Sequence, residues 1–302
     1  MKKHVIFPKN FVSDELIKLT SKFIDETLTP VADEFDLDFS QIKYISPSAV
    51  GLLDNLIGWL ENQGVTINVE AVTFNKEKMC PISFLRDAGF FEKYLENAEE
   101  EYRIVESKYI LPINTLKSSN YEEWSNKFSL WISSILEVEV SEVASITAAV
   151  KDILNNVSDH ANIDTCGIFG QYILSKKQFY ISISDFGVGI PYNVKHYLNN
   201  NFDDLESLKW AMVEGNSTRS TPKNRGAGLH FLLSNIVQNN CGTLRIFSNR
   251  AKIICKSSES GIQLEGIENK ISHPGTLILI KLDKHQLMNN LDEKEEFTWD
   301  EL

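Results

Sequence analysis

The residues with the clearest capacity for chemistry lie in the stretch SDFGVGIP, residues 184–191. Asp185 ends an alternating, strand-like run, and Gly187 and Gly189 permit positive φ and a close approach of the backbone to a ligand. A carboxylate in this position would accept a hydrogen bond from a ligand amino group. Alone, the pattern D-x-G-x-G is more typical of an ordinary turn, so its meaning depends on what else the chain carries.

A second group of polar residues falls on a helix predicted from ITAAVKDILNNVSDHAN, residues 146–162. Asp152, Asn156 and His160 are each four residues apart and therefore line one edge of that helix. A solvated face is the alternative, but Asn is a poor helix former and recurs at 155 and 156. An amide oxygen beside a carboxylate suits a hard cation such as Mg²⁺. The core-facing stripe consists of Ile146, Ala149, Val150, Ile153, Leu154 and Val157.

The third stretch is NRGAGLHFLLSNIVQNNCG, residues 224–242, which predicts a helix opened by Gly226 and Gly228. Glycines at a helix N-terminus expose backbone N–H groups, which with the helix dipole attract anions. Lys223 and Arg225 lie just before this helix and suit phosphate charge. The polar segment before them is expected to form either a mobile lid or a surface excursion. No Walker loop occurs.

The elements that must position these residues fall into two patterns. In the first hundred residues, strand-like 34–42, helix-like 49–64 and strand-like 65–72 predict a βαβ unit and a small α/β domain. The acidic stretch 96–108 marks a domain boundary.

The second pattern predicts a two-layer α/β sandwich. A strand at 109–113 leads into two helices, the second running from Ser145 to His160. Four further strands are expected in an antiparallel-looking set, at 178–184, 242–248, 251–257 and 275–282. The acidic end, 286–302, is predicted to be a loose tail.

Composition limits the classes of function. The 302 residues carry a net charge of −12, which argues against nucleic acid as the main ligand. Four cysteines, at 80, 166, 241 and 255, form no C-x-x-C pair and favour buried thiols in a reducing cytoplasm. No signal peptide and no membrane-spanning run is visible, so we expect a cytoplasmic protein without a membrane partner.

Taken in order, the three stretches resemble the GHKL ATPases, the family of gyrase, histidine kinases, mismatch-repair ATPases and ninety-kilodalton heat-shock chaperones. DILNNVSDHA is similar to the family's N-box, DFGVGIP to its first glycine box, GAGL to its second glycine box and PGTLILIKL to its final strand. The resemblance covers residues 110–283. It implies that Asn156 binds Mg²⁺, that Asp185 contacts the adenine amino group, and that Thr276 lies near Asp185. It also implies that ATP is the cofactor, with Gly226, Gly228, Lys223 and Arg225 at its phosphates.

One departure concerns turnover, because hydrolytic members carry Glu where this chain has Asp152. The shorter side chain reaches a water less well, so binding is better supported than hydrolysis. Among subfamilies, histidine kinases fit poorly, since residues 101–150 contain no acceptor His. The anti-sigma-factor serine kinases are the closer match.

The N-terminal pattern resembles a STAS domain, the fold of anti-sigma-factor antagonists. The segment SPSAVG places Ser46 at the usual Asp position and Pro47 at the phosphoacceptor, so the family's phosphorylation switch is absent there. Ser46 and Ser48 remain alternative acceptors. The resemblances give a STAS-like domain at 1–100, a connecting segment at 101–118, a GHKL-type domain at 119–285 and the tail at 286–302.

The function expected from these resemblances is an ATP–Mg²⁺-binding regulator whose ATP state controls contact with a protein partner, with Asp152 positioning or activating a water or hydroxyl. The alternatives are a serine/threonine kinase acting on a separate STAS protein, a non-catalytic interaction module, and a dimeric ATPase gate, so a homodimer stays open. The resemblance places His160 at the end of the N-box, so it is counted with the cofactor-binding residues. With no second His or Cys nearby, it is expected to hydrogen-bond or cap and not to bind a metal ion.

Overall fold

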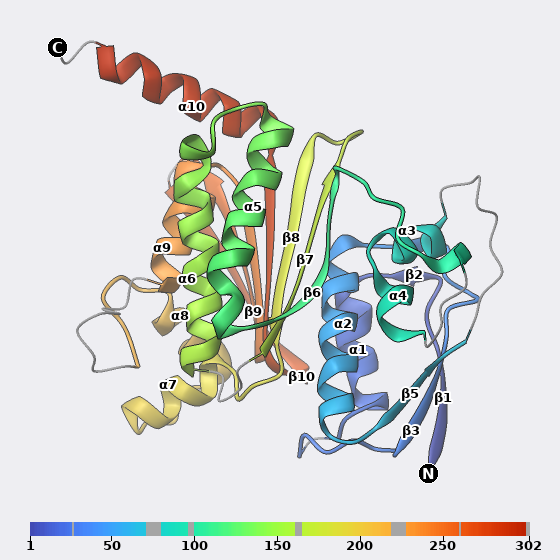
Figure 1. Ribbon diagram of the computed structural model, residues 1–302. Helices are drawn as coiled ribbons and strands as arrows, with labels where there is room; N and C mark the ends of the chain where they lie inside the picture. The colour runs from blue at the N-terminus through green and yellow to red at the C-terminus, as the bar shows by residue number, and fades with distance from the viewer. Residues whose placement is uncertain are drawn as a thin grey trace.

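The computed structural model describes residues 1–25, 27–70, 80–95, 100–160, 165–218, 228–259 and 261–299, with the side chains of 101, 157–160, 271 and 292–299 left outside the description. The chain has a mixed α/β fold in which layers alternate (Figure 1). A small sheet is followed by helices α1 and α2, a larger sheet and an outer layer of helices. None of the described helices is long and apolar enough to cross a bilayer.

The N-terminal unit, which we define as described residues 1–95, contains a three-stranded parallel sheet in the order β1-β3-β5. A short parallel pair, β2 with β4, lies beside it. Its elements are β1 (Lys2–Ile6), β2 (Asn10–Phe11), α1 (Ser13–Leu19), β3 (Glu34–Asp38), β4 (Tyr44–Ile45), α2 (Pro47–Asn62), β5 (Thr66–Val69), α3 (Pro81–Asp87) and α4 (Phe90–Tyr94). The expected strand–helix–strand order is present.

Local sequence explains where α2 begins. Ser46 is its N-cap, and the Ser46 Oγ accepts a hydrogen bond from the Ala49 N–H at 3.3 Å. Pro47 occupies the first turn, where its missing N–H costs nothing. The segment aligned with a phosphoacceptor is therefore built as a helix start.

The C-terminal unit, described residues 100–299, contains a five-stranded sheet in the order β6-β7-β8-β10-β9 with antiparallel neighbours. Its strands are β6 (Ile110–Lys117), β7 (Thr165–Ile173), β8 (Gln178–Asp185), β9 (Thr243–Ser258) and β10 (Gly261–Asp283). Its helices are α5 (Tyr121–Leu136), α6 (Ala144–His160), α7 (Ile190–Leu198), α8 (Asp204–Ala211), α9 (Gly228–Leu233), which continues as a π-helix (Ser234–Asn239), and α10 (Lys284–Trp299). Helices α5, α6 and α9 cover one face of the sheet (Figure 1).

Two expectations for this unit were wrong. The strands expected at 242–248 and 251–257 form one continuous strand, β9, in which Asn249 takes a positive φ of 50° instead of starting a turn. The expected loose tail begins as helix α10. Asp283 caps that helix by accepting a hydrogen bond from the His285 N–H at 3.0 Å, and Leu287, one turn into the helix, is buried.

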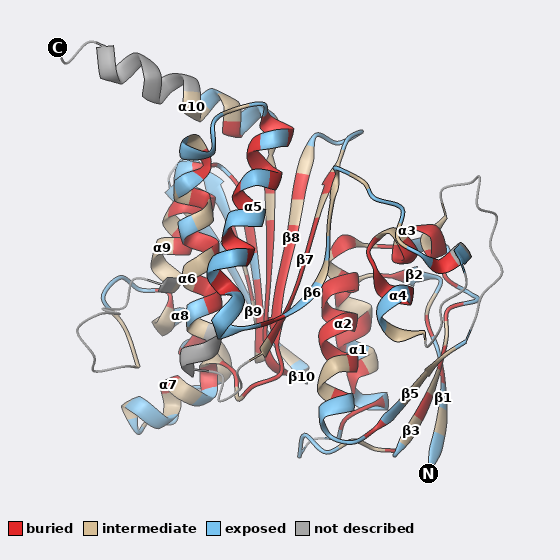
Figure 2. Cartoon of the chain, viewed as in Figure 1, coloured by how far each residue is buried: buried red, intermediate tan, exposed pale blue. Residues whose placement is uncertain are grey.

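Helix α2 is buried on nearly all sides, because it lies between the two sheets (Figure 2). Small residues on both partners permit this approach. A Cβ at Gly51 would lie 2.2 Å from the Oγ of Ser182 on β8, and a Cβ at Gly167 on β7 would lie 2.8 Å from the Cβ of Asn55 on α2. The helix therefore rests directly on the back of the larger sheet.

The two units share one core as a result. Five buried residues of the larger sheet and its loops pack with the N-terminal core instead of the helical layer, namely Phe169, Phe186, Phe247, Leu277 and Leu279. Apolar burial thus extends across the boundary expected near residue 100.

Polar contacts also connect the units. Asp54 on α2 is fully buried and accepts a bond from the Thr115 hydroxyl of β6 at 3.5 Å, and Lys93 Nζ donates to the same hydroxyl at 2.7 Å. On the other side, Lys252 of β9 forms an ion pair with Asp14 of α1 at 2.9 Å.

We expect Gly51→Ala to destabilise the protein by about 2 kcal/mol, because the added methyl group overpacks the contact with Ser182. Gly58→Ala is the matched control on the same helix, since a Cβ there meets nothing within 4 Å. It should gain up to about 1 kcal/mol from helix propensity. Urea unfolding of both variants measures the difference, and equal stability would contradict the packing argument.

Candidate functional site

Asp185 is the centre of the candidate site, at the end of β8. In the β8–β10 register it stands opposite Thr276, and it is only 3% exposed. Its Oδ1 accepts a hydrogen bond from the Gly187 N–H at 2.8 Å. Burial raises the pKa of the Asp185 carboxyl to about 7, and the N–H groups of Gly187 and Thr276 oppose that shift.

The electrostatics of this carboxylate are unusual for a buried acid. Within the described part of the chain, no Lys, Arg or His forms an ion pair with Asp185. A buried charge without a cation is costly, so the raised pKa keeps the carboxyl protonated unless a further N–H donor is present. Such a donor would stabilise the ionised form.

Hydroxyl groups fix the neighbouring backbone. The Ser248 Oγ on β9 lies 3.0 Å from the Thr276 Oγ1 and donates to the Gly275 carbonyl at 2.9 Å. It also accepts from the Ile190 N–H at 2.9 Å, which ties the start of α7 to both strands. Gly275 has a φ of 76°, and a Cβ there would lie 2.1 Å from the Asp185 carbonyl oxygen. Only glycine therefore permits this approach of β10 to Asp185.

The two glycines of the DFGVG turn have different roles. Gly189 has a φ of 83°, and a Cβ there would lie 2.4 Å from the Oδ1 of Asn249. Gly187 does not take a positive φ and contributes its N–H to Asp185. Sequence reasoning missed Ser248, Gly275 and Asn249. The pattern P-G-T was a usable signal for Gly275, whereas nothing local distinguishes Ser248.

The second group of predicted residues lies on α6. Asp152 and Asn156 are half-buried on this helix, whereas the neighbouring Asn155 is exposed. Burial raises the pKa of the Asp152 carboxyl, and Lys151 opposes the shift. Helix α6 packs against α9, whose first residue is Gly228. The N-terminal end of α9 and the polar edge of α6 thus belong to adjacent helices of one layer (Figure 1).

Part of the predicted site lies outside the described residues. This holds for Lys223, Arg225 and Gly226, and for the side chain of His160, the last residue of α6. Asp185, Gly187, Gly189 and Thr276 come together at one end of the sheet.

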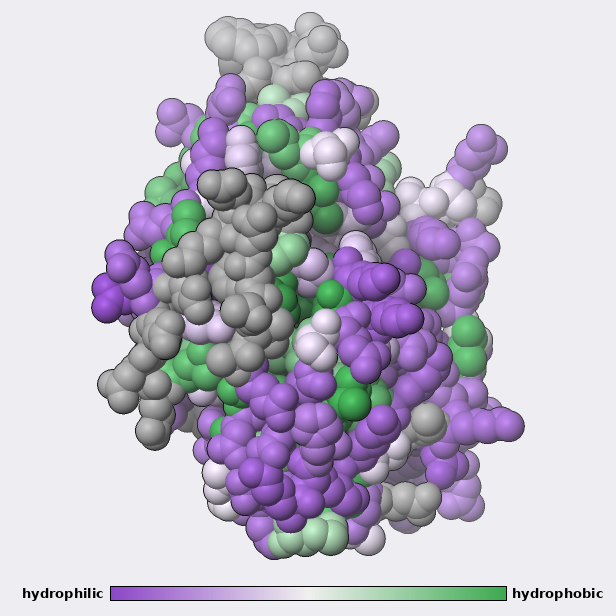
Figure 3. All heavy atoms as spheres, turned by 90° about the vertical axis from the view of Figure 1, so that its right-hand side faces the viewer, coloured by the Kyte–Doolittle hydropathy of each residue, from purple (hydrophilic) through white to green (hydrophobic). Residues whose placement is uncertain are grey.

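A different set of potential metal ligands lies on the outer face of the small sheet. Within the described part of the chain, His4, Asp36 and Glu70 place one ligand atom each within 4.8 Å of the others. This face is largely hydrophilic (Figure 3). Lys2 Nζ pairs with Asp36 at 2.9 Å, and Asn68 donates to the same carboxylate at 2.8 Å. These bonds explain the clustering of the three side chains as part of a network of ion pairs and hydrogen bonds across the strands.

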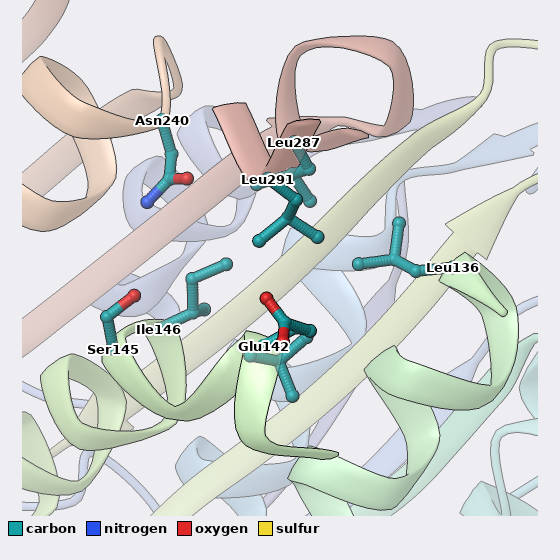
Figure 4. Close-up of a pocket in the computed structure, with 8 residues that line it drawn as sticks. Leu136, Glu142, Ser145, Ile146, Asn240, Leu287 and Leu291 are labelled. Carbon is teal, nitrogen blue, oxygen red and sulfur yellow. The ribbon is translucent and has the colours of Figure 1, made fainter. Parts of the chain in front are cut away.

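A small pocket lies where α10 meets the ends of α5 and α6 (Figure 4). It is lined by Leu136, Glu142, Val143, Ser145, Ile146, Asn240, Leu287 and Leu291. Leucine side chains from α5 and α10 fill much of its surroundings (Figure 4). None of the predicted site residues lines it, so it is separate from the candidate site.

We expect Asp185→Asn to remove a pH dependence of stability. Because the pKa of this carboxyl is about 7 in the folded protein against an ordinary value of 3.8, its ionisation costs free energy that grows as pH rises through that window. The variant should therefore gain stability over wild type with rising pH, on the order of 4 kcal/mol above about pH 7. Urea unfolding at about pH 4.5 and about pH 8 measures this gain.

Asp33→Asn serves as the control. That carboxylate is 88% exposed, and the N-terminal ammonium group holds its pKa below the usual range. Its replacement should change stability little and in the opposite direction. A gain for Asp185→Asn that is equal at both pH values would contradict the burial argument.

Comparisons with known proteins leave the family open. No family model matches the chain, and no curated protein does. One solved structure that matches is described as "Crystal Structure of N terminal domain of a DNA repair protein". It is 18% identical, the match covers 39% of this chain and 30% of that one, and the TM-score is 0.17. A TM-score this low does not indicate a shared fold, so no family or function follows from the match.

Proposed function

We propose that this chain is an ATP–Mg²⁺-binding regulatory protein with a GHKL-type nucleotide site, whose ATP state controls contact with a protein partner. The observation that carries the proposal is Asp185, a buried carboxylate at a strand end whose bonds come from backbone N–H groups. An exocyclic amino group is the donor that such an acceptor requires, and adenine supplies one beside a flat apolar ring. Thr276 lies opposite Asp185 in the strand register, and the neighbouring glycines let the backbone come close to the carboxylate.

The arrangement of helices supports the remainder of the site. Asn156 and Asp152 lie on the half-buried edge of α6, and the adjacent helix α9 begins at Gly228. Oxygen ligands on one helix beside the N-terminus of another suit a Mg²⁺-bound triphosphate. Asn156 would hold the cation, and the adjacent glycine-rich segment would face the phosphates.

Asp152 is the residue on which turnover depends. Its raised pKa and half-buried position suit a group that takes a proton from water or from a substrate hydroxyl. In the proposal, its carboxylate positions the attacking oxygen, and slow ATP hydrolysis follows. Transfer to a serine or threonine of a protein is the alternative use of the same group.

The N-terminal unit fits a degenerate STAS-like domain, with parallel strands β1, β3 and β5 and helix α2 packed on them. Because α2 is also packed on the larger sheet, this unit is an integral part of the protein in the proposal, and the regulated partner is a separate molecule.

Asp185→Asn should weaken binding of ADP by more than about tenfold, because the amide presents a donor in place of one acceptor oxygen. Pyrophosphate, which has no base, should bind wild type and variant alike. Calorimetric titration of both ligands with Mg²⁺ measures the two affinities. Equal losses for ADP and pyrophosphate would place Asp185 outside the base site.

Asn156→Ala should abolish the Mg²⁺ dependence of ATP affinity, because the variant lacks the amide oxygen. The neighbouring Asn155→Ala is the matched control, since that side chain is exposed on the same helix. Titrations with ATP in the presence of Mg²⁺ and of a chelator give the dependence for each protein. If both variants keep it, Asn156 is not a ligand of the cation.

Asp152→Asn should leave ATP affinity within about twofold of wild type and remove phosphate release. The measurement is steady-state release of inorganic phosphate, paired with calorimetry on the same sample. Loss of ATP binding in this variant would instead make Asp152 a metal or structural residue.

A further inference from the structure

One aromatic contact connects the N-terminal unit to the turn that carries Asp185. Trp59, near the C-terminal end of α2, stacks on Phe186 with ring centroids 5.8 Å apart and an interplanar angle of 30°. Phe186 directly follows Asp185 and is 4% exposed. A residue of one unit therefore packs against the sequence neighbour of the central residue in the other.

The side chains of Asp185 and Phe186 point to opposite faces of the larger sheet. Ile181 and Ile183 of β8 pack in the core of the helical layer, whereas Phe186 packs in the shared core around α2. Because successive side chains point to opposite faces, Asp185 lies on the helical-layer side and Phe186 on the α2 side. The turn is thus held from behind by the N-terminal unit.

His273 holds Phe186 from a second side. Its ring lies 5.6 Å from that of Phe186 in an edge arrangement, and it is 1% exposed. Within the described residues, neither imidazole nitrogen has a hydrogen-bond partner, and burial lowers the pKa of His273 to about 3. The ring is therefore neutral and acts here as a packing surface. Phe186 therefore packs against two aromatic rings, those of Trp59 and His273.

The turn transmits the position of Phe186 to the carboxylate. The Asp185 Oδ1 accepts a bond from the Gly187 N–H at 2.8 Å across Phe186, so a backbone displacement at Phe186 would move both ends of the bond. The base of the support is fixed as well, because the Ser184 Oγ donates to the Gly51 carbonyl of α2 at 3.5 Å and Gly51 rests on Ser182.

We propose that Trp59 is a positioning residue of the base site: by packing on Phe186, it holds the Asp185 carboxylate in the orientation that accepts the amino group of a purine base. The inference rests on the proposed function and adds that the N-terminal unit sets affinity for the base. The phosphate side of the ligand does not depend on Trp59. By linkage, a ligand on Asp185 also stabilises the packing of Trp59.

Calorimetric titrations of the full chain with ADP and with pyrophosphate, each with Mg²⁺, test this proposal. Trp59→Ala should weaken ADP binding about tenfold and leave pyrophosphate unchanged. Trp59→Phe keeps an aromatic ring on Phe186 and should restore ADP affinity to within about twofold of wild type. Trp210→Ala on α8, which removes a partly exposed indole that contacts Tyr197, is the matched control and should leave both affinities unchanged.

The outcomes separate the proposals. If wild type binds neither ATP nor ADP, the proposed function is overturned and this inference with it. ADP binding that Asp185→Asn weakens and Trp59→Ala leaves unchanged overturns the inference alone. Equal losses for ADP and pyrophosphate in Trp59→Ala, without rescue by Trp59→Phe, show a general structural role and also overturn it. Thermal unfolding followed by circular dichroism verifies that each titrated variant is folded.

Discussion

The burial of α2 between two sheets is the constraint on which the fold and the site depend. A three-stranded sheet buries little surface alone, and the larger sheet has apolar residues on both faces, so each needs a cover. Helices α1 and α2 lie between the sheets and cover both, and the small residues Gly51 and Gly167 set how closely α2 approaches the larger sheet. The orientation of the Asp185 turn is then a consequence of this packing, because Phe186 belongs to the same core.

The elements with a strong local pattern could be predicted from the sequence, and those decided by tertiary contact could not. Helix α6 has a regular apolar stripe, so its bounds were predicted to within a residue at its start. The sequence predicted two strands in place of β9 because Asn249 and Arg250 are typical of a turn. In the structure β9 pairs with β10 on both sides of these residues and remains one strand. Helix α10 was not predicted because its acidic composition is typical of an unstructured tail. Its start is stabilised by the Asp283 cap and by the burial of Leu287.

The candidate site shows the same division. Asp185 could be singled out because it ends an alternating run, and the resemblance of PGTLILIKL to the final GHKL strand predicted Thr276 near it; the β8–β10 register pairs the two residues. Ser248 and Trp59 could not, since a serine in a strand and an indole on an amphipathic helix have many ordinary explanations. Their roles follow only from neighbours that are distant in sequence, such as Gly275 for Ser248 and Phe186 for Trp59.

The position of β9 at the edge of the larger sheet affects how the chain behaves at high concentration. An edge strand presents unpaired N–H and C=O groups to other molecules, and a long one invites intermolecular strand pairing. Strand β9 carries three exposed basic residues, Arg245, Arg250 and Lys256, along its sixteen residues. Bringing two such edges together would oppose like charges in a desolvated ladder. In a protein of net charge −12, basic residues on the edge strand are therefore expected to disfavour pairing of two copies through β9.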